Sequence, residues 1–235
     1  MVHVQVPETL DADTVRELHE ALSAALADPA IRVVKLSGSA HCFCRGVNLG
    51  RALRGSEAEC AAAEFAACLS EIRLAPKPVI AIVEGPATGG GVGLAAAADL
   101  VIASPAATFS LTELLFGLLP AIILPYLLER LSAAKVRLWS LGGQTWHAAE
   151  AQSAGLVDVV TAGPDCEPML TAWTRRLSRA EPEAVGRWKC YTAEAVPFDR
   201  DRGAVVTAGM LRDPKVLDRI RRFVEEEALP WQEVR

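Results

Sequence analysis

The chain has 235 residues, of which 51% are hydrophobic and 23% are charged, and its formal net charge is −5. This length suits one domain, or one domain with a small appendage. The high apolar content and small net charge argue against a disordered chain, and the mildly acidic balance argues against a dedicated nucleic-acid-binding protein.

The first half of the chain alternates patterns that are typical of strands and helices. The apolar run 78–83 is continuous, as expected for a strand buried on both faces. The segment 13–27 repeats apolar residues at helical spacing, and Asp13 is its predicted N-cap. In chain order we predict a strand at 2–6, a helix at 13–27, a strand at 33–37, a helix at 56–74, a strand at 78–83, a helix from 89–91 to 98, and strands at 100–103 and 108–111.

Helical patterns dominate the second half. The predicted elements are helices at 125–131, 133–141 and 148–154, a strand at 157–160, and helices at 167–179, 182–195, 199–211 and 214–225. Strand–helix units followed by a helical region indicate an α/β fold.

The apolar run 114–128 raises the question of a membrane span. It is shorter than the roughly 20 residues that a helix needs to cross a bilayer, and Pro120 and Pro125 interrupt it. Residues 1–6 lead directly into acidic, polar sequence, which does not fit a signal peptide. The six cysteines lack metal-ligand spacing with histidine and are interpreted as reduced thiols. We therefore expect a cytoplasmic protein without a membrane span.

Two glycine-containing segments each follow a predicted strand: HCFCRGVNL at 41–49 and GPATGGGVGL at 85–94. Consecutive glycines let a substrate approach the backbone, and they leave N–H groups free at the positive end of a helix, where an oxyanion can be stabilised. The second segment is neither a P-loop nor a dinucleotide-binding fingerprint, because the required lysine and acidic residue are missing. Tight helix packing is the alternative explanation of the glycine triplet.

Glu113 is a lone carboxylate in a third segment, FSLTELLFGLLP at 109–120. Its apolar neighbours would remove it from water, which raises the pKa of a carboxyl group and suits it to proton transfer near neutral pH. The alternative is a glutamate at the start of a helix with its carboxylate in water.

These three segments, in this order and spacing, resemble the crotonase (enoyl-CoA hydratase/isomerase) superfamily. The run KPVIAIVEGPATGGGVGLAAAADLVIASP at 77–105 is similar to the central block of that family, and AQSAGLVDVV at 151–160 is similar to its later helix–strand signature. The resemblance implies an α/β crotonase-like ββα spiral core over 1–180 and a C-terminal helical region over 181–235. It also implies a homo-oligomer, either a trimer or a hexamer.

The resemblance assigns roles to individual residues. In the family two backbone N–H groups bind the thioester oxygen, and the matching donors are those of Val47 and Gly90. Removing a proton beside a thioester places negative charge on that oxygen, so two preorganised donors lower the barrier. Gly89 and Gly91 flank the second donor and are predicted to lie against the substrate.

Hydratases of the family use two glutamates. The first matches Gly93 and is absent, whereas the second matches Glu113. A single carboxylate can serve a syn elimination, in which it takes the α-proton and then protonates the departing hydroxyl. Hydration by two glutamates is therefore not expected.

Two further runs, SLTELLFGLLPAIILPYLLERL at 110–131 and LPW at 229–231, are similar to the dehydratases of polyketide β-branching cassettes. Those enzymes convert 3-hydroxy-3-methylglutaryl-acyl carrier protein into the 3-methylglutaconyl thioester. The related decarboxylases in general lack the counterpart of Glu113, so its presence favours the dehydratase. The alternatives are a generic enoyl-CoA hydratase or isomerase, and a non-catalytic homologue that only binds an acylated carrier.

The carrier and the remaining contacts depend on polar residues. Asn48 either orients substrate or water, or bonds to nearby backbone. Arg45 and Lys189 are candidates for binding the distal carboxylate of the substrate. Five basic residues and no acidic one lie between 32 and 56, which favours an acidic acyl carrier protein, or a CoA phosphate, at the site entrance. They are Arg32, Lys35, Arg45, Arg51 and Arg54. We expect no metal and no cofactor beyond the phosphopantetheine or CoA that carries the substrate.

Overall fold

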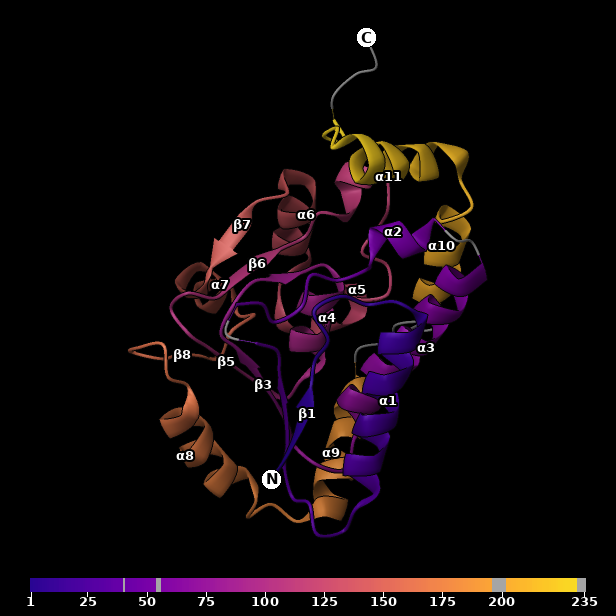
Figure 1. Ribbon diagram of the computed structural model, residues 1–235. Helices are drawn as coiled ribbons and strands as arrows, with labels where there is room; N and C mark the ends of the chain where they lie inside the picture. The colour runs from indigo at the N-terminus through magenta and orange to yellow at the C-terminus, as the bar shows by residue number, and fades with distance from the viewer. Residues whose placement is uncertain (40, 54–55, 196–201, 232–235) are drawn as a thin grey trace.

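The computed structural model describes residues 1–39, 41–53, 56–195 and 202–231 (Figure 1). Within these residues the main sheet is parallel throughout and has the strand order β1-β2-β3-β5-β8. Its strands are β1 (Val2–Gln5), β2 (Val34–Ser37), β3 (Val79–Val83), β5 (Leu100–Ala103) and β8 (Val159–Val160). A smaller sheet has the order β4-β6-β7 and consists of β4 (Ala87–Thr88), β6 (Thr108–Ser110) and β7 (Thr145–His147).

Helices connect and cover these strands. The first are α1 (Ala12–Ala27), α2 (Leu49–Ala52), α3 (Ser56–Leu74) and α4 (Gly90–Ala97). A 3₁₀ helix at Glu113–Phe116 precedes α5 (Leu124–Arg130), α6 (Ala133–Gly142) and α7 (Ala148–Ala154). The last are α8 (Glu167–Leu177), α9 (Pro182–Glu194), α10 (Arg202–Met210) and α11 (Pro214–Glu226). The predicted α/β fold with a helical C-terminal region is confirmed.

The main sheet is buried on both faces, which explains the unbroken apolar run of β3. Successive side chains of a strand point to opposite faces. Val79 and Ala81 belong to the core that also contains α1, α3 and α4 residues, whereas Ile80 and Ile82 pack with Leu170 of α8. Figure 1 shows α8 on one side of this sheet and α1 and α3 on the other.

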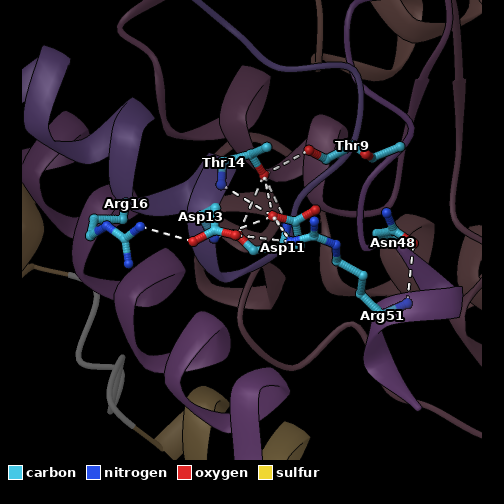
Figure 2. Close-up of polar contacts among 7 residues, drawn as sticks. All are labelled: Thr9, Asp11, Asp13, Thr14, Arg16, Asn48 and Arg51. Atoms are coloured by element: carbon cyan, nitrogen blue, oxygen red, sulfur yellow. Dashed lines mark hydrogen bonds and ion pairs between the residues drawn. The ribbon is translucent and has the colours of Figure 1, made fainter. Parts of the chain in front are cut away.

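The start of α1 differs from the prediction. Asp11, and not Asp13, is the N-cap, because its carboxylate accepts hydrogen bonds from the backbone N–H groups of Asp13 and Thr14, both at 3.2 Å (Figure 2). A capping side chain reaches the N–H groups two and three residues further on. Asp13 is therefore inside the first turn, where its side chain pairs with Arg16 instead.

The apolar run 114–128 is divided between the 3₁₀ helix and α5. Phe116 packs with Ile220 of α11, whereas Leu127 belongs to the main core. Within the described ranges, no helix is both long enough and apolar enough to cross a membrane.

The C-terminal helices pack against α2, α3 and the 3₁₀ helix that contains Glu113. α9 and α10 pack against α3, and α11 packs against α2 and the 3₁₀ helix. The predicted helix 199–211 corresponds to α10, and its first residues lie outside the described residues. α11 therefore lies beside the turn that carries Glu113.

Candidate active site

Two segments that are far apart in the sequence are held together near the start of α4. Cys44 forms a parallel bridge with Ala87, and its carbonyl oxygen accepts a hydrogen bond from the Thr88 N–H at 2.8 Å. Three residues further along the same segment, Val47 forms a parallel bridge with Leu10. The segment 41–49 is therefore fixed between the start of α1 and the glycine turn that opens α4.

The backbone N–H groups of Val47 and Gly90 lie close to each other. Gly46 has a φ of +78°, which favours glycine, and a Cβ on it would be 3.1 Å from the Gly90 nitrogen. Val47 follows directly. Among the described residues, neither the Val47 N–H nor the Gly90 N–H donates a hydrogen bond. Gly90 is also the first residue of α4, where N–H groups have no partner within the helix.

The Glu113 carboxylate lies beside the same glycine turn. A Cβ on Gly89 would be 3.1 Å from Glu113 Oε1. Glu113 Oε2 is buried and, in the described part of the chain, accepts no hydrogen bond. Burial raises the pKa of Glu113 to about 7. The alternative interpretation, a carboxylate in water, is wrong, and the group can accept and return a proton near neutral pH.

The other two glycines of the triplet are in contact with protein groups. The Gly89 N–H donates to the Ser110 carbonyl oxygen at 3.0 Å. Gly91 packs so closely on Cys44 that a Cβ would overlap the Cys44 carbonyl oxygen. Tight packing, the alternative explanation of the glycine triplet, therefore applies to Gly91.

Gly93 has no room for a side chain. It lies one turn after Gly89 in α4, and a Cβ on it would be 2.9 Å from Ile123 Cβ. Ile123 is 3% exposed and belongs to the main core. Ile123 fills the space that a side chain at position 93 would need, so an acid cannot stand there. Within the described residues, the carboxylate that lies beside the glycine turn is that of Glu113.

Replacing Gly93 by Glu should therefore destabilise the protein and not supply a second acid. Overpacking a core costs about 1–3 kcal/mol, and a buried unpaired carboxylate adds to this cost. Urea unfolding measures the effect. Gly163→Glu is the control, because nothing lies within 4 Å of a Cβ at Gly163. Equal unfolding midpoints for the two variants would contradict the role given to Ile123.

A small cavity of about 60 Å³ lies beside Val47. Leu10 and Phe65 also line it. The same two apolar side chains pack on Gly90, where a Cβ would be 2.6 Å from Leu10 Cδ1 and 3.3 Å from Phe65 Cζ. Gly90 therefore shares two neighbours with the cavity, although neither Gly90 nor Glu113 is among the residues that line it. Its polar lining consists of Asp11, Asn48, Arg51 and Thr207.

Asn48 has the local role that the sequence left open. It is the N-cap of α2, and its Oδ1 accepts a hydrogen bond from the Arg51 N–H at 3.2 Å (Figure 2). Asn48 also lines the cavity. The cap fixes α2 so that Arg51 faces the start of α1, where its Nη1 lies 3.0 Å from Asp13 Oδ2.

Neither basic residue proposed for the distal carboxylate lines the cavity. Arg45 is exposed and pairs with Glu8, with Nε 2.8 Å from Oε1. Lys189 is 3% exposed, and its Nζ lies 2.8 Å from Asp99 Oδ2. Acidic residues from distant parts of the chain contact both side chains, and a role of either in binding the substrate stays a prediction.

Of the described basic residues in the run 32–56, Arg51 lines the cavity, and the basic site entrance stays a prediction. Each of its described members has a partner from elsewhere in the chain, and Arg54 lies outside the described residues. The partners are the carbonyl oxygens of Ser178 and Ala180 for Arg32, Glu167 for Lys35, Glu8 for Arg45, and Asp11 and Asp13 for Arg51. The described basic side chains of this run therefore contact different parts of the fold.

Sequence patterns missed the apolar residues that surround the donors. Leu10, which precedes α1, and Ile122, which precedes α5, carry no motif of their own. Phe65 was recognisable only as part of the apolar side of a helix. Ile123 had no signal other than the glycine that it faces at position 93.

Comparisons with known proteins agree with this geometry. The family model described as enoyl-CoA hydratase/isomerase matches residues 2–233. The bacillaene synthase dehydratase PksH of Bacillus subtilis is 30% identical over 210 residues, which cover 86% of this chain and 80% of that protein. A probable enoyl-CoA hydratase, echA17, of Mycobacterium avium is 33% identical over 185 residues, covering 77% of this chain and 71% of that protein.

A solved structure extends the likeness to the fold. A putative enoyl-CoA hydratase from Mycobacterium avium paratuberculosis has a TM-score of 0.83 and 29% sequence identity, and the match covers 98% of this chain and 93% of that one. The chain therefore belongs to the enoyl-CoA hydratase/isomerase family and has the crotonase fold.

Proposed function

We propose that this protein removes water from a 3-hydroxy-3-methylglutaryl group on an acyl carrier protein and gives the 3-methylglutaconyl thioester, as in polyketide β-branching. The observation that carries the proposal is the single buried carboxylate of Glu113 beside the glycine turn. Ile123 occupies the place where a second acid would stand. The relative named bacillaene synthase dehydratase supports a dehydration as the type of reaction.

The proposed mechanism uses groups that lie together. The thioester oxygen accepts hydrogen bonds from the Val47 and Gly90 N–H groups, which stabilise the negative charge that develops on it. The Glu113 carboxylate removes the α-proton. The resulting carboxylic acid then protonates the hydroxyl on the β-carbon, the carbon–oxygen bond breaks, and water leaves as the double bond forms.

The generic activity of the family is the second candidate. Relatives of similar identity are described as probable enoyl-CoA hydratases, such as the one from Mycobacterium avium. A non-catalytic carrier-binding protein is disfavoured, because a buried carboxylate with a raised pKa reduces stability without serving packing.

The substrates that react distinguish these candidates. We would compare kcat/KM for three thioesters: the 3-hydroxy-3-methylglutaryl group on an acyl carrier protein, the same group on CoA, and an unbranched enoyl-CoA. The proposal predicts the highest value on the carrier protein. Preference for the enoyl-CoA would favour the generic hydratase, and no reaction with any of them would favour the non-catalytic homologue.

The pH dependence follows from the environment of Glu113. With a pKa of about 7, the carboxyl group is mainly protonated at lower pH and cannot accept the α-proton. We expect kcat/KM to fall about tenfold for each pH unit below neutrality and to be level above it. Initial rates across this range measure the profile. Activity that stays constant down to the ordinary pKa range of a glutamate would contradict the assignment.

The proposed homo-oligomer has support from exposed apolar residues. Leu138 and Leu141 on α6 are each 71% exposed, and large exposed apolar side chains are often covered by another subunit. Light scattering on the purified protein would give its mass relative to the 25.1 kDa chain.

A further inference from the structure

The proposed substrate carries two functional ends, and the groups described above account for only one of them. The Val47 and Gly90 N–H groups and Glu113 act on the thioester, the α-carbon and the β-hydroxyl. The acyl group also ends in a carboxylate, which is charged at neutral pH and needs a cationic or hydrogen-bonding partner when it leaves water. Arg45 and Lys189 are engaged elsewhere.

The cavity beside Val47 contains a suitable group. Among the described residues that line it, Arg51 is the one cationic side chain. Most of the other lining residues are apolar, including Leu10, Val15 and Phe65. A carboxylate that enters this cavity loses water on the apolar sides and meets a guanidinium at one side. The guanidinium fork matches the geometry of a carboxylate.

The present contacts of Arg51 can be exchanged. Its Nη1 lies 3.0 Å from Asp13 Oδ2 and 3.4 Å from Asp11 Oδ1 (Figure 2). Asp11 Oδ1 already accepts the N–H groups that cap α1. The side chains of Arg51 and Asp13 are 41% and 57% exposed, and an ion pair between exposed side chains is weak, whereas the longer contact is to Asp11, which is 9% exposed and also lines the cavity. A carboxylate inside the cavity can therefore compete for the guanidinium.

We propose that Arg51, which lines the cavity whereas Arg45 and Lys189 do not, binds the distal carboxylate of the substrate and so selects acyl groups that end in a carboxylate. This inference rests on the proposed function and adds its specificity-determining residue. Asn48 acts with Arg51 as a positioning residue, because it caps the short helix that carries the arginine.

A pair of matched substrates tests this inference. One is the 3-hydroxy-3-methylglutaryl thioester, and the other has a neutral amide in place of the distal carboxylate. We expect wild type to favour the acid by about 10- to 100-fold in kcat/KM, the usual contribution of a hydrogen-bonded charged group. In Arg51→Gln this preference should fall close to one, through an increased KM for the acid. Arg51→Lys should recover part of it.

Arg16→Gln is the matched control. Arg16 Nη2 also pairs with Asp13, at 2.8 Å, but Arg16 does not line the cavity (Figure 2). The Arg16→Gln variant should keep the wild-type preference for the acid over the amide. If wild type converts the acid and Arg51→Gln keeps the full preference, or loses both substrates equally, the role of Arg51 is overturned while the proposed function stands. If wild type converts neither substrate, the proposed function itself fails and the role of Arg51 fails with it.

Discussion

Replacing Glu113 by Gln should reduce kcat for dehydration by about 100- to 10,000-fold, the usual contribution of general acid–base catalysis. The amide keeps the size of the side chain but cannot accept the α-proton or return it to the hydroxyl. Because Ile123 leaves no room for an acid at position 93, a second carboxylate cannot replace Glu113 from there. Single-turnover measurements with a loaded thioester would give the rate constants of both proteins.

The same variant should remain folded and become more stable than wild type above neutral pH. Its stability provides the control for the loss of activity. Folding raises the pKa of Glu113 from 4.5 to about 7, so the folded state binds the proton more tightly than the unfolded state. Wild type therefore loses stability as pH rises through this window, by about 3 kcal/mol, whereas the Gln variant does not. A Glu113→Gln protein that is folded and fully active would overturn the mechanism.

Replacing Lys189 by Ala should destabilise the fold by about 2–5 kcal/mol, because it empties a buried position and leaves the carbonyl oxygens that the ammonium contacts without their donor. Lys189 Nζ contacts Asp99 Oδ2 at 2.8 Å, the Ile72 carbonyl oxygen at 3.0 Å and the Lys77 carbonyl oxygen at 3.3 Å. The lysine therefore ties α9 to the end of α3 and to the start of β3. Urea unfolding at neutral pH would measure the loss.

The control for Lys189 comes from the same helix. Arg187 pairs with Glu183 at 3.3 Å, but both side chains are about four-fifths exposed. Such a pair contributes at most about 0.5 kcal/mol, so Arg187→Ala should be close to wild type. A second variant, Lys189→Met, keeps much of the packing and should still be destabilised. Lys189 is structural if these variants lose stability, and a change below that of Arg187→Ala would contradict the assignment.

Local patterns predicted the elements and the segments of the site well. The run 78–83 is apolar without interruption because β3 is covered on both faces, and the glycines 89–91 open α4 where the sequence placed a helix start. These features depend on neighbouring residues in the chain. Glu113 was also identifiable, because a lone carboxylate in an apolar stretch of sequence predicts burial, and the carboxylate is buried.

Long-range pairing could not be predicted in the same way. A basic run at 32–56 looks unopposed in sequence, but Glu167 reaches Lys35 from more than a hundred residues away. Lys189 likewise pairs with Asp99, which is 90 residues away in the sequence. Arg51 belongs to the same run. It differs from the other described basic residues of the run in that it lines the cavity, and the sequence does not show this.

Cap positions were uncertain for a physical reason. Asp11 and Asp13 are both good capping residues, and the choice between them depends on where the backbone leaves the helical conformation. Asp11 has a φ of −139°, which is extended, so the helix begins at Ala12. This difference of two residues leaves Asp13 available to pair with Arg51.

The most direct test of the proposed dehydration is the intact mass of an acyl carrier protein loaded with the 3-hydroxy-3-methylglutaryl group, measured before and after incubation with the wild-type protein. We expect the loaded carrier to lose the mass of one water with the wild-type protein and to keep its mass with Glu113→Gln. An unchanged mass with the wild-type protein, or loss of the mass of carbon dioxide in place of water, would contradict the proposed dehydration.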